Sequence, residues 1–155
     1  MKKMTLAMLV LASTLLVGCA SESTSGEESA ALASFRAEMS AEAEAQDAEI
    51  AQLERAGFTN LNTSGTVYSK FLDQGDANYT DCGYSRGVCS VIEVVAINGC
   101  SSLYVEANIE NSNGVVIDWA NDSVQNLGAG DHAVMHFTSF ESGAARIQMS
   151  EVNCR

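Results

Sequence analysis

Hydrophobic and polar residues alternate most regularly between positions 103 and 110. Apolar side chains stand at every second position there, at Leu103, Val105, Ala107 and Ile109. Because strand side chains point alternately to the two faces of a sheet, this pattern predicts a strand with one buried face. Asn113-Gly114 follows, a dipeptide that tolerates positive φ at both central turn positions, and an apolar run resumes from Val115 to Trp119. We therefore predict a hairpin over residues 103–119, and for the sole tryptophan, Trp119, we favour a place in the core over a ligand platform.

Four further segments have the hydrophobicity of strands, namely residues 66–72, 88–97, 132–140 and 145–152. Residues 88–97 are apolar on both faces apart from Glu93, which indicates a central strand. Short strands separated by polar turns are typical of an antiparallel sandwich. We predict a mainly β fold for the domain at residues 57–155.

A helical pattern precedes this domain. Residues 30–56 are rich in Ala and Glu, lack Gly and Pro, and carry a narrow apolar seam at spacings of three and four. The seam consists of Leu32, Phe35, Met39, Ala43, Gln46, Ile50 and Leu53. Because its middle holds only Ala43 and Gln46, we favour a helical spacer that ends before Gly57 over a coiled-coil stalk or a partner-docking helix, and we expect a monomer. Residues 19–29, poor in apolar side chains, read as a disordered tether.

The amino terminus has the features of an export signal. Lys2 and Lys3 precede an apolar run from Leu6 to Val17, which is shorter than the about 20 residues that span a bilayer. Leu16-Val17-Gly18-Cys19 then resembles the lipobox of bacterial lipoproteins. The resemblance implies that residues 1–18 are a signal peptide and that Cys19 carries lipid, including acyl chains such as palmitate. The chain would then be held on the extracytoplasmic face of the cell membrane, or in the outer membrane of a Gram-negative host.

Part of the strand region also resembles a known family. The segments concerned are Leu103 to Ile109, Asn113-Gly114-Val115-Val116, Leu127-Gly128-Ala129-Gly130 and an apolar strand ending at Phe137. Together they resemble secreted bacterial immunoglobulin-like domains of the FxLYD kind over about residues 88–152, with Ala129 where that family usually has Pro. The resemblance implies an immunoglobulin-like sandwich on a lipoprotein, without assigned chemistry.

Charge and cysteine content narrow the possible partners and the compartment. The formal net charge of −12 disfavours binding to nucleic acid or anionic headgroups. Removing the lipidated Cys19 from the five cysteines leaves four, which can pair in three ways. We favour the pairing of Cys82 with Cys89 and of Cys100 with Cys154. Disulfides themselves are expected of an exported domain. These spacings do not suit a zinc site, which needs ligand pairs two to four residues apart.

Few residues suggest a metal site or catalysis. His132 and His136 could share one face of a strand, with Met135 on the other, and a copper or zinc site there is the less favoured interpretation. Asp73, Asp76 and Asp81 resemble a calcium loop in composition only. The sequence contains no nucleophile elbow, phosphate loop or metal-binding His-Glu motif. We therefore expect neither an enzyme nor a cofactor or metal.

The loop closed by Cys82 and Cys89 is the favoured candidate for contact with a partner. Tyr79, Tyr84 and Arg86 belong to residue types enriched in interface hot spots, and a ring would pre-organise them. A loop stapled only for stability is the simpler interpretation. The favoured function is a lipid-anchored envelope protein that presents its sandwich to a protein or polymer, and the alternative is a carrier of a small ligand or metal.

Overall fold

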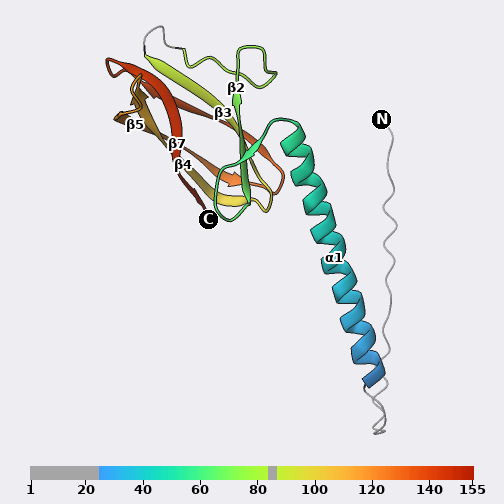
Figure 1. Ribbon diagram of the computed structural model, residues 1–155. Coiled ribbons are helices and arrows are strands. Elements are labelled where there is room, and N and C mark those ends of the chain that lie inside the picture. The colour runs from blue at the N-terminus through green and yellow to red at the C-terminus, as the bar shows by residue number, and fades with distance from the viewer. Residues whose placement is uncertain (1–24, 84–86) are drawn as a thin grey trace. The chain divides into compact units, whose positions relative to one another are not determined.

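A computed structural model describes residues 25–83 and 87–155, with the side chains from Ala30 onward. Helix α1 (Ser25–Arg55) comes first and seven strands follow. The strands are β1 (Thr59–Asn60), β2 (Val67–Leu72), β3 (Val88–Ala96), β4 (Cys100–Asn111), β5 (Val116–Leu127), β6 (His132–Ser139) and β7 (Ala144–Cys154) (Figure 1). Among the described residues, the chain divides into two units between Met39 and Ser40, and the second unit is Ser40–Arg155. The strands belong to the second unit.

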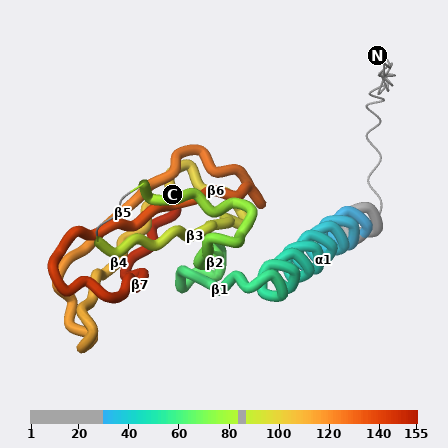
Figure 2. Tube along the Cα trace, turned by 90° about the horizontal axis from the view of Figure 1, so that it is seen from above, coloured from blue at the N-terminus to red at the C-terminus, as the bar shows by residue number. Residues whose placement is uncertain are grey.

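The strands form two antiparallel sheets, which confirms the predicted mainly β sandwich. Sheet A has the order β1-β2-β3-β6 and sheet B the order β5-β4-β7. Strand β3 pairs with both β2 and β6, so the segment around Glu93 is central as predicted. The path of the chain through both sheets can be followed in Figure 2. The predicted segment 66–72 corresponds to β2, and 145–152 lies within β7.

The core lies between the inner faces of the two sheets. Its buried side chains come from alternate positions of the strands, as the period of two in residues 103–110 predicts. They include Val67, Ile92, Val94, Leu103, Val105, Ile109, Met135, Phe137 and Ile147. Burial of this apolar surface provides most of the driving force for folding.

The hairpin between β4 and β5 differs in detail from the prediction. The Gly114 N–H donates to the Asn111 carbonyl at 3.0 Å, and the Asn111 N–H donates to the Val115 carbonyl at 2.9 Å. Gly114 has a φ of 77°, whereas Asn113 has no positive φ. The connection is therefore a three-residue loop in which a type I turn is followed by a left-handed glycine, and not a two-residue turn with positive φ at both positions.

Two aspartates of β5 join the edges of the two sheets. The Ser139 hydroxyl of β6 donates to Asp118 Oδ2 at 2.6 Å, and the His136 backbone N–H donates to Asp122 Oδ2 at 2.9 Å. The hydrogen bond from Ser139, followed by one from the Trp119 backbone, holds the pKa of Asp118 below its usual value. These carboxylates satisfy polar groups along β6 that an open sheet edge would leave unpaired.

Helix α1 begins earlier and ends almost where expected. Its start at Ser25 makes the predicted tether 19–29 wrong for residues 25–29, while residues 19–24 lie outside the described chain. Acidic residues favour the first turn of a helix, and Glu27-Glu28 stands near this start. The predicted spacer over 30–56 is helical through Arg55.

The end of α1 is a Schellman motif. The Phe58 N–H donates to the Leu53 carbonyl and the Gly57 N–H to the Glu54 carbonyl, both at 3.0 Å. Gly57 has a φ of 90°, the left-handed conformation that glycine adopts without cost. The predicted stop at Gly57 is thus present, and the motif brings Phe58 against Leu53.

The last turns of α1 pack on the sandwich, whereas the first turns expose the seam. Leu53 and Phe58 are buried together with side chains of sheet A, namely Tyr68, Val95 and the adjoining Ile97, and Ile50 packs against this cluster. In the first unit, Leu32, Phe35 and Met39 remain more than half exposed. The compact unit that contains the sandwich therefore starts at Ser40, within the predicted spacer, and not at residue 57.

Candidate functional site

The disulfide-closed loop is present, but the structure describes only one of its three candidate contact residues. Cys82 and Cys89 form a disulfide with a Cα–Cα distance of 6.4 Å, as predicted. Tyr79 is half-buried, and its backbone N–H donates to the Asp76 carbonyl at 3.1 Å. Tyr84 and Arg86 lie outside the described residues. Their suggested role in partner binding stays a prediction.

The segment before this disulfide is fastened to the outer face of sheet A by side chains. Asn78 Nδ2 donates to Glu93 Oε1 at 2.7 Å, and Thr80 Oγ1 lies 2.7 Å from His136 Nε2. Residues 77–80 are therefore held against β3 and β6, and sequence reasoning did not connect β6 to this loop.

A lysine–aspartate pair fixes the start of the same segment. Lys70 Nζ lies 2.9 Å from Asp76 Oδ1, and the Asp73 backbone N–H donates to Asp76 Oδ2 at 2.8 Å. The hydrogen bond from the Asp73 backbone and then that from Lys70 lower the pKa of Asp76, while the bond to Asp76 raises the pKa of Lys70. Asp81 accepts a hydrogen bond from the Gly83 backbone. These contacts make Asp76 and Asp81 loop-fixing residues and give no support to a calcium loop.

Glu93 and His132 form a polar pair on this face, in which Glu93 is buried and His132 is exposed. The Glu93 side chain is buried, and its Oε1 lies 2.7 Å from His132 Nδ1 as well as accepting from Asn78. The His132 ring meets Phe58 edge to face at 5.9 Å. An open cavity of about 420 Å³ lies beside the pair, lined by Ala77, Asn78, Tyr79, Thr80, Glu93, His132, Ala133 and Val134. The sequence singled out His132 and Tyr79 but gave no sign that Glu93 would join them.

The two histidines lie on one face of β6 and Met135 on the other, as predicted. His132 and His136 engage groups on the outer face of sheet A, and Met135 is buried in the core. Within residues 30–83 and 87–155, no three His, Cys, Asp or Glu side chains are grouped closely enough to hold a metal ion. Glu93, Asn78 and His132 line the cavity, so it can offer a carboxylate, an amide and an imidazole to a polar ligand.

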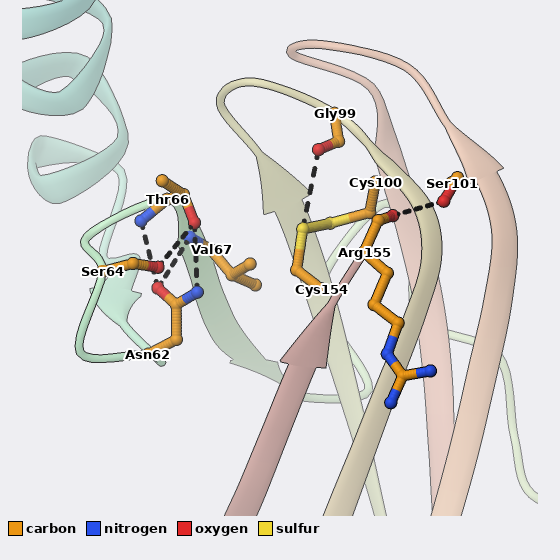
Figure 3. The surroundings of a disulfide bond; sticks show 9 residues. All are labelled: Asn62, Ser64, Thr66, Val67, Gly99, Cys100, Ser101, Cys154 and Arg155. Atoms are coloured by element: carbon orange, nitrogen blue, oxygen red, sulfur yellow. Dashed lines mark hydrogen bonds between the residues drawn. A yellow bond between two sulfur atoms is a disulfide. The ribbon is translucent and has the colours of Figure 1, made fainter.

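The second disulfide closes the opposite end of the sandwich. Cys100, the first residue of β4, is bonded to Cys154, the last residue of β7, with a Cα–Cα distance of 5.4 Å (Figure 3). The Ser101 hydroxyl donates to the Arg155 carbonyl at 2.6 Å, and Cys154 Sγ lies 3.5 Å from the Gly99 carbonyl oxygen. This pairing was also predicted. It fixes the end of the chain to the start of the central strand of sheet B.

Beside this disulfide, one asparagine organises the turn before β2. Asn62 Oδ1 accepts from the backbone N–H groups of Thr66 and Val67 at 3.0 and 3.1 Å, and Asn62 Nδ2 donates to the Thr66 hydroxyl at 3.1 Å (Figure 3). Ser64 shares a hydrogen bond with the same hydroxyl. The contacts hold the turn before β2 together and give Asn62 a structural role.

Sheet B presents a polar outer face, and Trp119 belongs to it. Its indole is 59% exposed, so the prediction that Trp119 lies in the core is wrong. Along β5 it is Asp118, Ala120, Asp122 and Val124 that are less exposed than their neighbours. A register irregularity between Ile109 and Glu110 precedes this region, so the apolar run from Val115 to Trp119 does not continue the inward row of β4.

The outer face of sheet B can be read from the strand register. Asn108 of β4 stands between Trp119 of β5 and Gln148 of β7, and Glu106 stands between Asn121 and Glu151. We call Asn108, Trp119, Asn121 and Gln148 the Trp119 patch. Sequence reasoning identified the wet side of residues 103–110, but it could not place strands β5 and β7 beside it.

No family model, curated protein or solved structure matched this chain. Among the residues that the structure describes, no helix is long and apolar enough to cross a membrane. The candidate sites therefore stand on the residues and their geometry alone.

Proposed function

We propose that this protein is a lipid-anchored lipoprotein of the cell envelope whose disulfide-stapled sandwich binds a protein or a polymer without catalysis. The anchor is Cys19, at the end of Leu16-Val17-Gly18-Cys19, and helix α1 follows it in the sequence before the strands. Two or three acyl chains bind a membrane far more stably than one. Residues 1–24 lie outside the described structure, so the anchor rests on the sequence.

The observation that carries this proposal is the pairing of all four cysteines other than Cys19. Cys82 bonds with Cys89, and Cys100 bonds with Cys154. Disulfides persist in oxidising compartments such as the periplasm and the cell surface, so this pairing supports export. Cys19 is the one cysteine left for lipid, and it stands where the lipobox resemblance requires it.

A binding role is supported by the difference between the two outer faces. Part of the outer face of sheet A is covered by the end of α1 and by residues 77–80. On sheet B the outward side chains of β5 and β7, including Trp119 and Gln148, are exposed. A rigid sheet face of this kind loses little conformational entropy on binding, which favours recognition.

The test compares the wild-type chain with Cys19→Ala in the native cells. We expect the wild type to remain with membranes through a high-salt wash and to be released by detergent. Cys19→Ala should be recovered outside the membrane fraction with both disulfides intact. A wild-type chain found in the cytosol with free thiols, or a Cys19→Ala chain that stays equally membrane-bound, would refute the anchored function.

A further inference from the structure

We propose that the Trp119 patch binds an uncharged glycan strand, with the Trp119 indole stacking on a sugar ring and the three amides hydrogen-bonding its hydroxyl groups. This inference rests on the proposed function and names the class of polymer. The sequence favoured the core over a ligand platform for Trp119, and its exposed position in the structure reverses that preference.

The strand register makes the patch compact. Asn108 is directly opposite Trp119 on one side and Gln148 on the other, and Asn121 follows Trp119 by two positions. Neighbouring strands are about 4.8 Å apart, so the row from Trp119 to Gln148 spans about 10 Å, and Asn121 lies about 7 Å along β5. These dimensions suit one or two sugar rings lying flat on the sheet.

The patch differs from the rest of the face in its unused hydrogen-bonding capacity. Elsewhere on the face most polar side chains, with the exception of Ser123, bond to each other: Tyr104 to Glu106 at 3.2 Å, Asn153 to Glu151 at 2.6 Å, and Gln125 to Ser102 at 2.9 Å. Arg146 likewise donates to Glu110. In the described part of the chain, by contrast, no protein group hydrogen-bonds the side-chain amides of the patch or the Trp119 indole N–H.

The chemistry of these groups matches a glycan. Each amide offers two donors and an acceptor, and sugar hydroxyls also both donate and accept. The flat indole face provides apolar area for the C–H face of a pyranose, while its N–H remains able to donate. Since all four residues stand on strands of one sheet, little conformational order has to be gained on binding.

Charge and composition favour this partner over others. Glu106 and Glu151 lie next to the patch on a chain with a net charge of −12, which opposes an anionic polymer. The cores of protein interfaces are enriched in aromatic residues, Met and Arg and depleted in charged residues, whereas this face is mostly Asn, Gln, Ser and Glu. An uncharged, hydroxyl-rich polymer satisfies both conditions.

The test measures retention of the acylated full chain, in detergent, on insoluble chitin and cellulose and on an array of soluble uncharged polysaccharides. Trp119→Ala should weaken retention by about tenfold or more, as expected of an aromatic anchor. Asn108→Ala and Gln148→Ala should each weaken it to a smaller degree. The melting temperature of Trp119→Ala should stay near that of wild type, because the indole is exposed.

Two matched variants serve as controls. Phe71→Ala removes a similarly exposed aromatic from sheet A, and Gln125→Ala removes an amide of sheet B that is already bonded to Ser102. Both should bind like wild type. Failure of every uncharged glycan to retain the chain, or equal losses in Trp119→Ala and Phe71→Ala, overturns the inference. Retention of an envelope protein through Trp119, with no glycan binding, also overturns it but leaves the anchored binding function standing.

Discussion

Removing the Cys100–Cys154 disulfide should cost far more stability than removing the Cys82–Cys89 disulfide. The first closes a sequence separation of 54 residues and the second a separation of 7. In the chain-entropy model these loops correspond to about 4 and about 2.5 kcal/mol of stabilisation at 25 °C. Cys100 is also buried while Cys89 is exposed, so truncation at Cys100 leaves a cavity that adds to the difference. Domains of this size have free energies of unfolding of only about 5–15 kcal/mol, so removing the Cys100–Cys154 disulfide costs a large share of the total stability.

The assay is urea unfolding of the two double-alanine variants, followed by circular dichroism in the strand region. We expect the Cys100→Ala/Cys154→Ala variant to lose at least about 1.5 kcal/mol more than the Cys82→Ala/Cys89→Ala variant. The slope of free energy against urea should be compared as well, because a change in slope would signal a changed denatured state. Equal losses, or a larger loss for the Cys82–Cys89 pair, would refute the argument from loop length and burial.

Three further variants test other parts of the fold. Leu53→Ala should lower the free energy of unfolding by about 2–5 kcal/mol because Leu53 is buried. Leu32→Ala, on the exposed seam of the same helix, should change it by less than about 0.5 kcal/mol. Chemical denaturation measures both free energies, and equal effects would contradict the packing of the last turns of α1. The Asp118 pKa is lower in the folded chain than in the unfolded chain, so the stability contributed by ionised Asp118 is complete above about pH 4 and is lost as the pH falls through the lowered pKa. Ser139→Ala removes the main hydrogen bond to Asp118 and should therefore flatten the decline of melting temperature on the acid side. An unchanged decline would contradict the assignment of the lowered pKa to this hydrogen bond. Gly87→Ala should lower the melting temperature by several degrees, since Gly87 has a φ of 96° and a Cβ there would lie 2.2 Å from the Ser139 carbonyl oxygen; a melting temperature equal to that of wild type would show that the loop relaxes freely.

Much of the fold could be predicted from local pattern because sheet burial has a period of two. The alternation from Leu103 to Ile109 predicted a strand with one buried face, which is the middle strand of sheet B, and the apolar segment around Glu93 predicted β3, an internal strand of sheet A. The stop at Gly57 was predictable for a similarly local reason, since a Schellman motif needs a left-handed residue there. The even count of cysteines predicted two disulfides, and the observed pairing is the one favoured among the three possible.

Features that depend on register or on distant contacts were not predictable. Trp119 was placed in the core because it ends an apolar run, but the register irregularity at Ile109 and Glu110 sets it on the outer face. The amino-terminal boundary of the compact unit was not predicted, because Ile50 and Leu53 pack against side chains of sheet A that are far from them in sequence.

The same reasoning applies to the candidate sites. The contacts of Glu93 with Asn78 and His132 span 15 and 39 positions, which no local pattern encodes. The Trp119 patch unites side chains of three strands, and only the pairing of β5 and β7 with β4 brings them together. The wet face of residues 103–110 was the one signal in the sequence that pointed toward it.

The most direct test of the account is the mass of the amino-terminal peptide of the protein isolated from its native cells. We predict that the peptide begins at Cys19, lacks residues 1–18 and carries a diacylglyceryl group on the cysteine sulfur. A peptide that still begins at Met1, or one whose Cys19 carries no lipid, would contradict the account.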